Sequence, residues 1–114
     1  MLSFMSTHLS EKKCIACEGD VPPLTNDQAH AFMRELDSSW RVADGQRIVR
    51  EFSFSNFKKT MVFVNKVAEV AEEEGHHPDM IVSYGKVIVE LWTHAIGGLS
   101  ENDFIVAAKI DTIQ

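Results

Sequence analysis

The chain has 114 residues, of which 45% are hydrophobic and 25% are charged, as is usual for one globular domain with its own core. Its formal net charge of -6 argues against direct nucleic-acid binding, because phosphate contacts need clustered Lys and Arg. No segment reaches the roughly 18 apolar residues of a membrane span, and the first residues lack the basic start of a secretion signal. We therefore expect a cytoplasmic protein without membrane contact.

The first 20 residues are expected to form a flexible leader before a single domain over residues 21–114. This leader holds Cys14 and Cys17 in a C-x-x-C pair, which could be reduced structural thiols, half of a zinc site or a redox dithiol. No second C-x-x-C pair is present to complete a zinc site, and two prolines follow where a redox motif would open a helix. The pattern favours reduced thiols and leaves the other two readings open.

Helix and strand patterns alternate after the leader. A first helix is expected to begin after Thr25, a candidate N-cap, and to end near residues 38–39. Two strands, residues 40–42 and 47–54, flank an Asp-Gly turn at residues 44–45, which is typical of a tight hairpin.

The longest helix is expected over residues 55–74, with Ser55 as its cap and Gly75 as its terminating glycine. Its apolar stripe has the spacing of a helix packed on a sheet and comprises Phe57, Met61, Val64, Ala68 and Ala71. Further apolar residues widen the stripe: Val62, Phe63, Val67 and Val70. The wider stripe predicts a second contact, such as another subunit.

A second hairpin is expected from strands at residues 80–83 and 86–94, and a last helix begins at Ser100. The order is then helix, two strands, helix, two strands, helix. Short hairpins imply antiparallel pairing, so the pattern predicts a two-layer α+β domain. Its four-stranded antiparallel sheet should be covered by helices on one face.

Three histidines and two acids form the most distinctive group. His76 and His77 precede Pro78 at a junction between helix and strand, and His94 ends a predicted strand. The unperturbed pKa of histidine is about 6.5, so one imidazole can give a proton while another accepts one. This group is therefore a candidate acid-base site.

The two acids are expected to support the histidines. Glu72 lies four residues before His76, on the same helical face, where its carboxylate could orient that ring. Asp103 lies in the first turn of the last helix, where it could also act as a cap. The same residue types can bind zinc, but adjacent histidines seldom reach one ion and no H-E-x-x-H motif occurs. No metal is therefore expected.

The motif residues also match a known pattern in order and spacing. They are Glu72-x-x-x-His76-His77-Pro78, Tyr84, Thr93-His94, Gly98-Leu99-Ser100 and Asp103. The match extends to Trp40, to the strand around Arg50 and to the cysteine-containing leader. This pattern resembles the pterin-4a-carbinolamine dehydratases over nearly the whole chain from about residue 10.

The resemblance implies a hydro-lyase that needs no cofactor. Its substrate would be the pterin 4a-hydroxytetrahydrobiopterin, which loses water to give quinonoid dihydropterin during tetrahydrobiopterin recycling. The resemblance also implies that the protein forms a homodimer or homotetramer. Two alternatives stay open: a pterin-binding accessory protein linked to molybdopterin, and a dimerisation cofactor of a transcription factor without a physiological dehydratase role.

The resemblance also implies roles for individual residues. His76 and His94 would be the acid-base pair, and His77 would position the pterin. Glu72 and Asp103 would orient or electrostatically support the histidines. The residues expected to bind the substrate are His76, His77, Pro78, Thr93 and His94.

Overall fold

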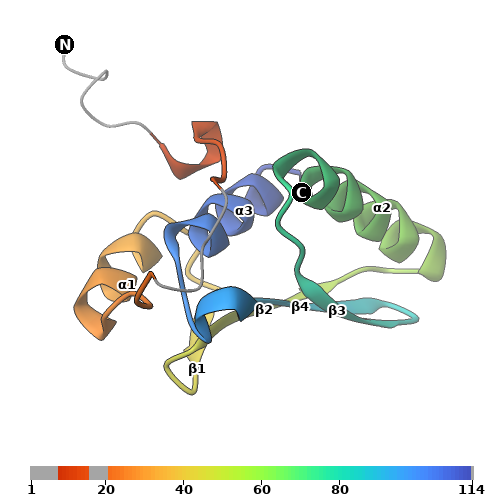
Figure 1. Ribbon diagram of the computed structural model, residues 1–114. Helices are drawn as coiled ribbons and strands as arrows, with labels where there is room; N and C mark the ends of the chain where they lie inside the picture. Colours follow the sequence, from red (N-terminus) through yellow and green to blue (C-terminus); the bar gives the residue numbers. More distant parts are fainter. Residues whose placement is uncertain (1–7, 16–20, 114) are drawn as a thin grey trace, which may run out of the picture.

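The computed structural model describes residues 8–15 and 21–113. In it, helices α2 (Phe57–Glu74) and α3 (Glu101–Asp111) lie across one face of a four-stranded antiparallel sheet (Figure 1). The strands are β1 (Arg41–Ala43), β2 (Arg47–Ser53), β3 (Asp79–Ser83) and β4 (Lys86–Leu91). The sheet order is β1-β2-β4-β3. The remaining elements are α1 (Asn26–Met33) and the 3-10 turns η2 (Leu9–Glu11) and η3 (His94–Ile96). This arrangement confirms the predicted α+β class.

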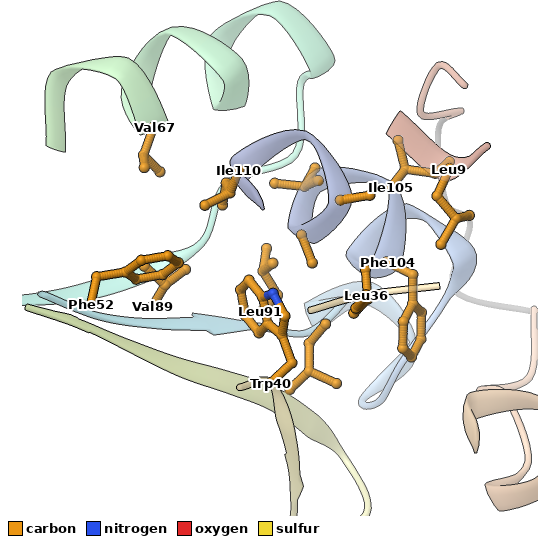
Figure 2. Close-up of a cluster of buried hydrophobic side chains, with 14 of the residues drawn as sticks. Leu9, Leu36, Trp40, Phe52, Val67, Val89, Leu91, Phe104, Ile105 and Ile110 are labelled. Carbon is orange, nitrogen blue, oxygen red and sulfur yellow. The ribbon is translucent and has the colours of Figure 1, made fainter. Parts of the chain in front are cut away.

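The core lies between the sheet and the two long helices. Figure 2 shows Phe52 and Leu91 from the sheet facing Val67 of α2 and Ile110 of α3. The central pair β2 and β4 is in register with Ile48 opposite Leu91. Because side chains alternate along a strand, this register places every second residue of both strands against the helices.

The first hairpin has the predicted turn. Asp44 and Gly45 have φ angles of 57° and 68°, the left-handed values that the central residues of a type I′ turn require, and the backbone N–H of Gln46 donates to the carbonyl of Ala43 at 3.1 Å. Helix α1 likewise starts at its predicted cap, because Thr25 and Gln28 each accept a hydrogen bond from the other's backbone N–H. The helix ends at Met33, earlier than expected, and turns carry the buried Leu36 into the core.

Helix α2 begins at Phe57, two residues after the predicted start at residue 55. Its cap is Asn56, whose Oδ1 accepts the backbone N–H of Lys59 at 2.8 Å, and Ser55 is exposed outside the helix. Its end agrees with the sequence, since Gly75 has a φ of 66° and turns the chain out of the helix.

The buried stripe of α2 differs from the predicted one. It comprises Thr60, Phe63, Val67, Ala71 and Glu74, whereas Phe57 and Ala68 are exposed. Two of the buried residues, Thr60 and Glu74, are polar, so the spacing of apolar residues alone does not predict which face of the helix is buried. The hydroxyl of Thr60 lies 2.9 Å from the carbonyl oxygen of Asn56 and 2.8 Å from that of Tyr84, so its one proton has an acceptor although the side chain is buried.

Strand β4 ends at Leu91, three residues before the predicted end at His94. The backbone N–H of Thr93 donates to the carbonyl of Gly98 at 2.8 Å, and Gly97 has a φ of 65°. This tight return takes His94 out of the sheet and into η3, so its side chain does not follow the alternation of the strand.

Part of the leader folds onto the domain. Leu9 of η2 is buried in the core beside α3, and Cys14 donates its backbone N–H to Glu74 of α2 at 2.9 Å. The flexible leader stays a prediction for residues 1–7 and 16–20, which lie outside the described residues together with Cys17. Within residues 8–15 and 21–113, no helix is long and apolar enough to cross a membrane.

Candidate functional site

The three histidines of the sequence motif line one cleft of about 390 Å³. The lining comes from two segments: the junction between α2 and β3, and the loop that follows β4. The lining residues are Gly75, His76, His77, Pro78, Asp79, Trp92, Thr93, His94 and Ala95. All five residues that the sequence nominated for substrate binding therefore lie at this cleft.

His76 is held by a buried carboxylate. Its Nε2 lies 2.6 Å from Oδ1 of Asp103, whose side chain is fully buried while that of His76 is 13% exposed. The other carboxylate oxygen, Oδ2, accepts the hydroxyl of Thr93 and the backbone N–H of Ser100, each at 2.9 Å. Asp103 thus caps α3 and fixes His76 at the same time, which unites the two roles expected for it.

The bond to Asp103 also constrains the proton on His76. An ionised carboxylate only accepts hydrogen bonds, so Nε2 of His76 must be the donor. In the neutral ring this leaves Nδ1 as the acceptor, the ring nitrogen that does not contact Asp103.

Glu72 holds His77, not His76. Its Oε2 lies 2.6 Å from Nε2 of His77, and both side chains are more than half exposed, at 78% and 58%. The expectation that Glu72 orients His76 is therefore wrong. Gly75 ends the helix and changes the direction of the chain, so the four-residue spacing of a helix no longer applies to His76.

His94 lies against an indole. The ring centroids of His94 and Trp92 are 3.9 Å apart with an interplanar angle of 39°. Trp92 also donates its Nε1 to Oδ2 of Asp79 across the cleft wall, at a long distance of 3.4 Å. Neither Trp92 nor Asp79 was predicted from the sequence as a site residue, although Trp92 precedes His94 by two residues and Asp79 follows the histidine motif.

Thr93 contributes to the site through its buried hydroxyl. Its side chain is buried, donates to Asp103 and lies 2.7 Å from the hydroxyl of Ser100. Because the single hydroxyl proton of Thr93 goes to the carboxylate, Ser100 is the donor in their shared bond. This network connects the loop that carries His94 with the carboxylate that holds His76.

Cys14 lies beside the end of α2 and the start of α3, where its backbone N–H donates to Glu74 and its Sγ lies 3.7 Å from the carbonyl oxygen of Asn102. Burial and the charge of Glu74 raise the pKa of its thiol to about 12, so the thiol stays protonated at neutral pH. Burial also acts to raise the pKa of Glu74, but the N–H of Cys14 and the charge of Lys109 outweigh it and hold that pKa below its usual value. Because the thiolate is the reactive and metal-binding form, Cys14 fits the reading of a structural thiol.

A metal site within the described ranges 8–15 and 21–113 would need several ligand side chains that converge on one point. No group of three or more His, Cys, Asp or Glu side chains there is arranged to hold an ion. Two of the cleft histidines are instead bound to carboxylates through Nε2.

Comparison with known proteins identifies related chains. Residues 22–113 match the family described as pterin 4 alpha carbinolamine dehydratase. A protein of Nitrosomonas eutropha is 54% identical over 105 residues, covering 92% of each chain, and one of Alkaliphilus metalliredigens is 47% identical over 107 residues, covering 94% of this chain and 96% of its own. Both carry the provisional name pterin-4-alpha-carbinolamine dehydratase.

Two solved structures share the fold. A transcriptional coactivator/pterin dehydratase from Brucella melitensis is 35% identical, with a TM-score of 0.75 over 80% of this chain and 97% of its own. A pterin dehydratase-like protein described as a RuBisCO assembly factor in the alpha-carboxysome is 26% identical, with a TM-score of 0.57 over 66% of this chain and 88% of its own. The family match over residues 22–113 and these relatives show that the chain belongs to the pterin-4a-carbinolamine dehydratase family.

Proposed function

We propose that this protein dehydrates 4a-hydroxytetrahydrobiopterin to quinonoid dihydropterin and water, as a hydro-lyase of tetrahydrobiopterin recycling. The observation that carries the proposal is the meeting of His76, His77 and His94 at one cleft of about 390 Å³. Membership of the dehydratase family supports the same reaction. The cytoplasm, the compartment expected from the sequence, is part of this proposal.

The reaction needs two proton transfers and no redox step. The bond from C4a to the hydroxyl oxygen breaks, the oxygen takes up a proton and leaves as water, and a ring nitrogen gives up a proton as the C=N bond forms. Positioned imidazoles near their own pKa are suited to both transfers, and such assistance is typically worth about 10²–10⁴-fold. The proposed reaction therefore proceeds without a cofactor.

His76 and His94 are the proposed acid-base pair. Both line the same cleft, His76 from the junction between α2 and β3 and His94 from the turn η3, so a pterin bound in the cleft could exchange a proton with each. Asp103 holds His76 through Nε2, which supports proton transfer at Nδ1. His77, more exposed and bound to Glu72, is the residue proposed to position the pterin.

An interaction role is the second candidate, because two structural relatives carry such descriptions, one as a transcriptional coactivator and one as a RuBisCO assembly factor. We propose it only as an alternative, since the histidine cleft has no use in such a role. A molybdopterin-linked accessory protein would use the same cleft for a different pterin. Comparing rates with biopterin-type and molybdopterin-type substrates separates these readings.

Self-association as a homodimer or homotetramer is also proposed. Strand β3 is an edge of the sheet, and Ile81 on it is 56% exposed. The exposed rings of Phe57 and Tyr84 stack beside it with centroids 6.3 Å apart. Unpaired strand edges and apolar patches are typical of interfaces. The apolar coat of α2 supports this less than expected, because Phe63 and Val67 belong to the core.

Two measurements test these proposals. Carbinolamines dehydrate spontaneously, so the quantity to measure is the acceleration of synthetic 4a-hydroxytetrahydropterin dehydration over the buffer rate. A folded protein that gives no acceleration contradicts the enzyme. Light scattering that finds only a monomer of 12.8 kDa at micromolar concentration contradicts self-association.

A further inference from the structure

The three cleft histidines are restrained in different ways. His76 and His77 each place Nε2 at 2.6 Å from a carboxylate oxygen. His94 is exposed, and among residues 8–15 and 21–113 neither of its ring nitrogens has a hydrogen-bond partner. The imidazole ring of His94 instead packs against the indole ring of Trp92.

The backbone between these two aromatic rings is fixed. Thr93 donates its N–H to the carbonyl of Gly98 at 2.8 Å and its hydroxyl to Asp103 at 2.9 Å. Trp92 and His94 flank this buried residue and project so that their ring centroids meet at 3.9 Å. Strand β3 adds a restraint through the bond from Trp92 to Asp79. The indole is thus held from two elements, whereas His94 belongs to a single 3-10 turn.

We infer that Trp92 positions His94 for proton transfer, as Asp103 positions His76. The inference rests on the proposed dehydratase function and adds a specific residue to its site. An indole face restricts an imidazole without using its ring nitrogens, so both nitrogens of His94 stay available to a substrate. The indole face also attracts a cation, so the contact is kept when His94 carries a proton.

This arrangement gives the two proposed acid-base residues complementary properties. His76 exchanges a proton only at Nδ1, because its Nε2 is bound to Asp103. His94 can use either nitrogen, and the exposed turn gives it contact with solvent for proton return. The indole then fixes the orientation of the His94 ring, which a side chain on a short exposed turn would otherwise lack. Such orientation matters because displacing a reacting group by about 1 Å can lower the rate by about 10²-fold.

The first arm of the test separates kcat from KM in the full-length protein. Trp92→Leu should lower kcat roughly 10-fold and change KM less than about 2-fold, because orientation is lost while the cleft remains. Trp92→Phe keeps a flat aromatic face and should restore most of kcat. The matched control is Trp40→Phe at the other, buried tryptophan, which should lower stability and leave kcat unchanged. If Trp92→Leu keeps the wild-type kcat, the positioning role is wrong.

The second arm does not depend on activity. The ring current of Trp92 should shift the carbon-bound ring protons of His94 in the NMR spectrum, with His94→Gln used to assign them. Trp92→Leu should remove that shift and leave the signals of His76 and His77 in place. Unchanged His94 signals would mean that the stack does not form in solution, which overturns the inference. If the wild type accelerates nothing while the ring-current shift is present, the proposed function fails and the Trp92–His94 contact stands as a structural one.

Discussion

Oε2 of Glu72 lies 2.6 Å from Nε2 of His77, and the pair is exposed to solvent, whereas the equally short contact between His76 and Asp103 is buried. Exposed ion pairs contribute about 0–1 kcal/mol, because water and salt screen them. Removing one partner of a buried hydrogen-bond network costs more, since the remaining groups lose their partners without regaining water. The two histidine–carboxylate pairs should therefore respond very differently to substitution.

The substitution Asp103→Asn should destabilise the protein by about 1–3 kcal/mol and lower kcat by roughly 10-fold or more. The amide has one accepting oxygen and one donating nitrogen, so the cap of α3 can be kept only if the amide N–H2 faces His76, whose Nε2 must then accept and whose proton moves to Nδ1. Glu72→Gln is the matched control and should change the free energy of unfolding by less than about 0.5 kcal/mol. Urea unfolding and steady-state rates check both variants, and equal losses from the two would contradict the assigned roles.

Glu74 should make stability depend on acid pH. Its pKa in the folded protein lies below its ordinary value of 4.5, so its contribution is present above that value and is lost as the pH falls through the folded pKa. Glu74→Gln should therefore be clearly less stable than the wild type at pH 7, and the difference should shrink below about pH 4. Urea unfolding at the two pH values measures this. A difference that does not change with pH would show that the carboxylate charge is not the stabilising feature.

Cys14 should react slowly with thiol reagents. With its pKa near 12, almost none of it is thiolate at neutral pH, so alkylation should be at least about 10²-fold slower than for a free thiol. A Cys17→Ser variant isolates Cys14 for the measurement, and the same variant unfolded in urea is the control. Rapid labelling in the native protein would support the redox or zinc readings of the C-x-x-C pair.

Chelation should leave the protein unchanged. Dialysis against a strong chelator is expected to alter neither the dehydration rate nor the melting temperature, because His76 and His77 are bound to carboxylates and no group of possible ligands in residues 8–15 and 21–113 is arranged to hold an ion. Metal analysis before and after dialysis is the control. Stoichiometric zinc whose removal abolishes activity would contradict the metal-free mechanism.

The sequence predicted the elements better than the side-chain contacts within them. The caps and turns that act locally, Thr25, Gly75 and the Asp44–Gly45 pair, are where they were expected, because each depends on the geometry of a few adjacent residues. The buried stripe of α2 was misplaced because polar Thr60 and Glu74 belong to it. Their burial depends on partners far along the chain, such as Cys14, which apolar periodicity does not contain.

The candidate site shows the same division. The three histidines of the predicted site do line one cleft, but the spacing on the helix paired Glu72 with His76, whereas its carboxylate contacts His77. It also extended the strand to His94 and so missed the turn that sets His94 against Trp92. Both errors arise where a regular element ends and the chain takes a direction set by tertiary contacts.

His77 should behave differently from the other two cleft histidines. If it binds the substrate and the transition state alike, His77→Ala should mainly raise KM and leave kcat nearly unchanged. The variant therefore serves as the control for the acid-base pair, since it removes an imidazole from the same cleft.

The measurement that tests the account most directly is the acceleration of synthetic 4a-hydroxytetrahydropterin dehydration over the buffer rate in His76→Ala, in His94→Ala and in the double variant. Each single variant should lose roughly 10²-fold or more of the acceleration. The double variant should lose less than the product of the two single losses, because the residues act as a unit. Full activity of His94→Ala, or multiplicative losses in the double variant, would contradict an acid-base pair formed by His76 and His94.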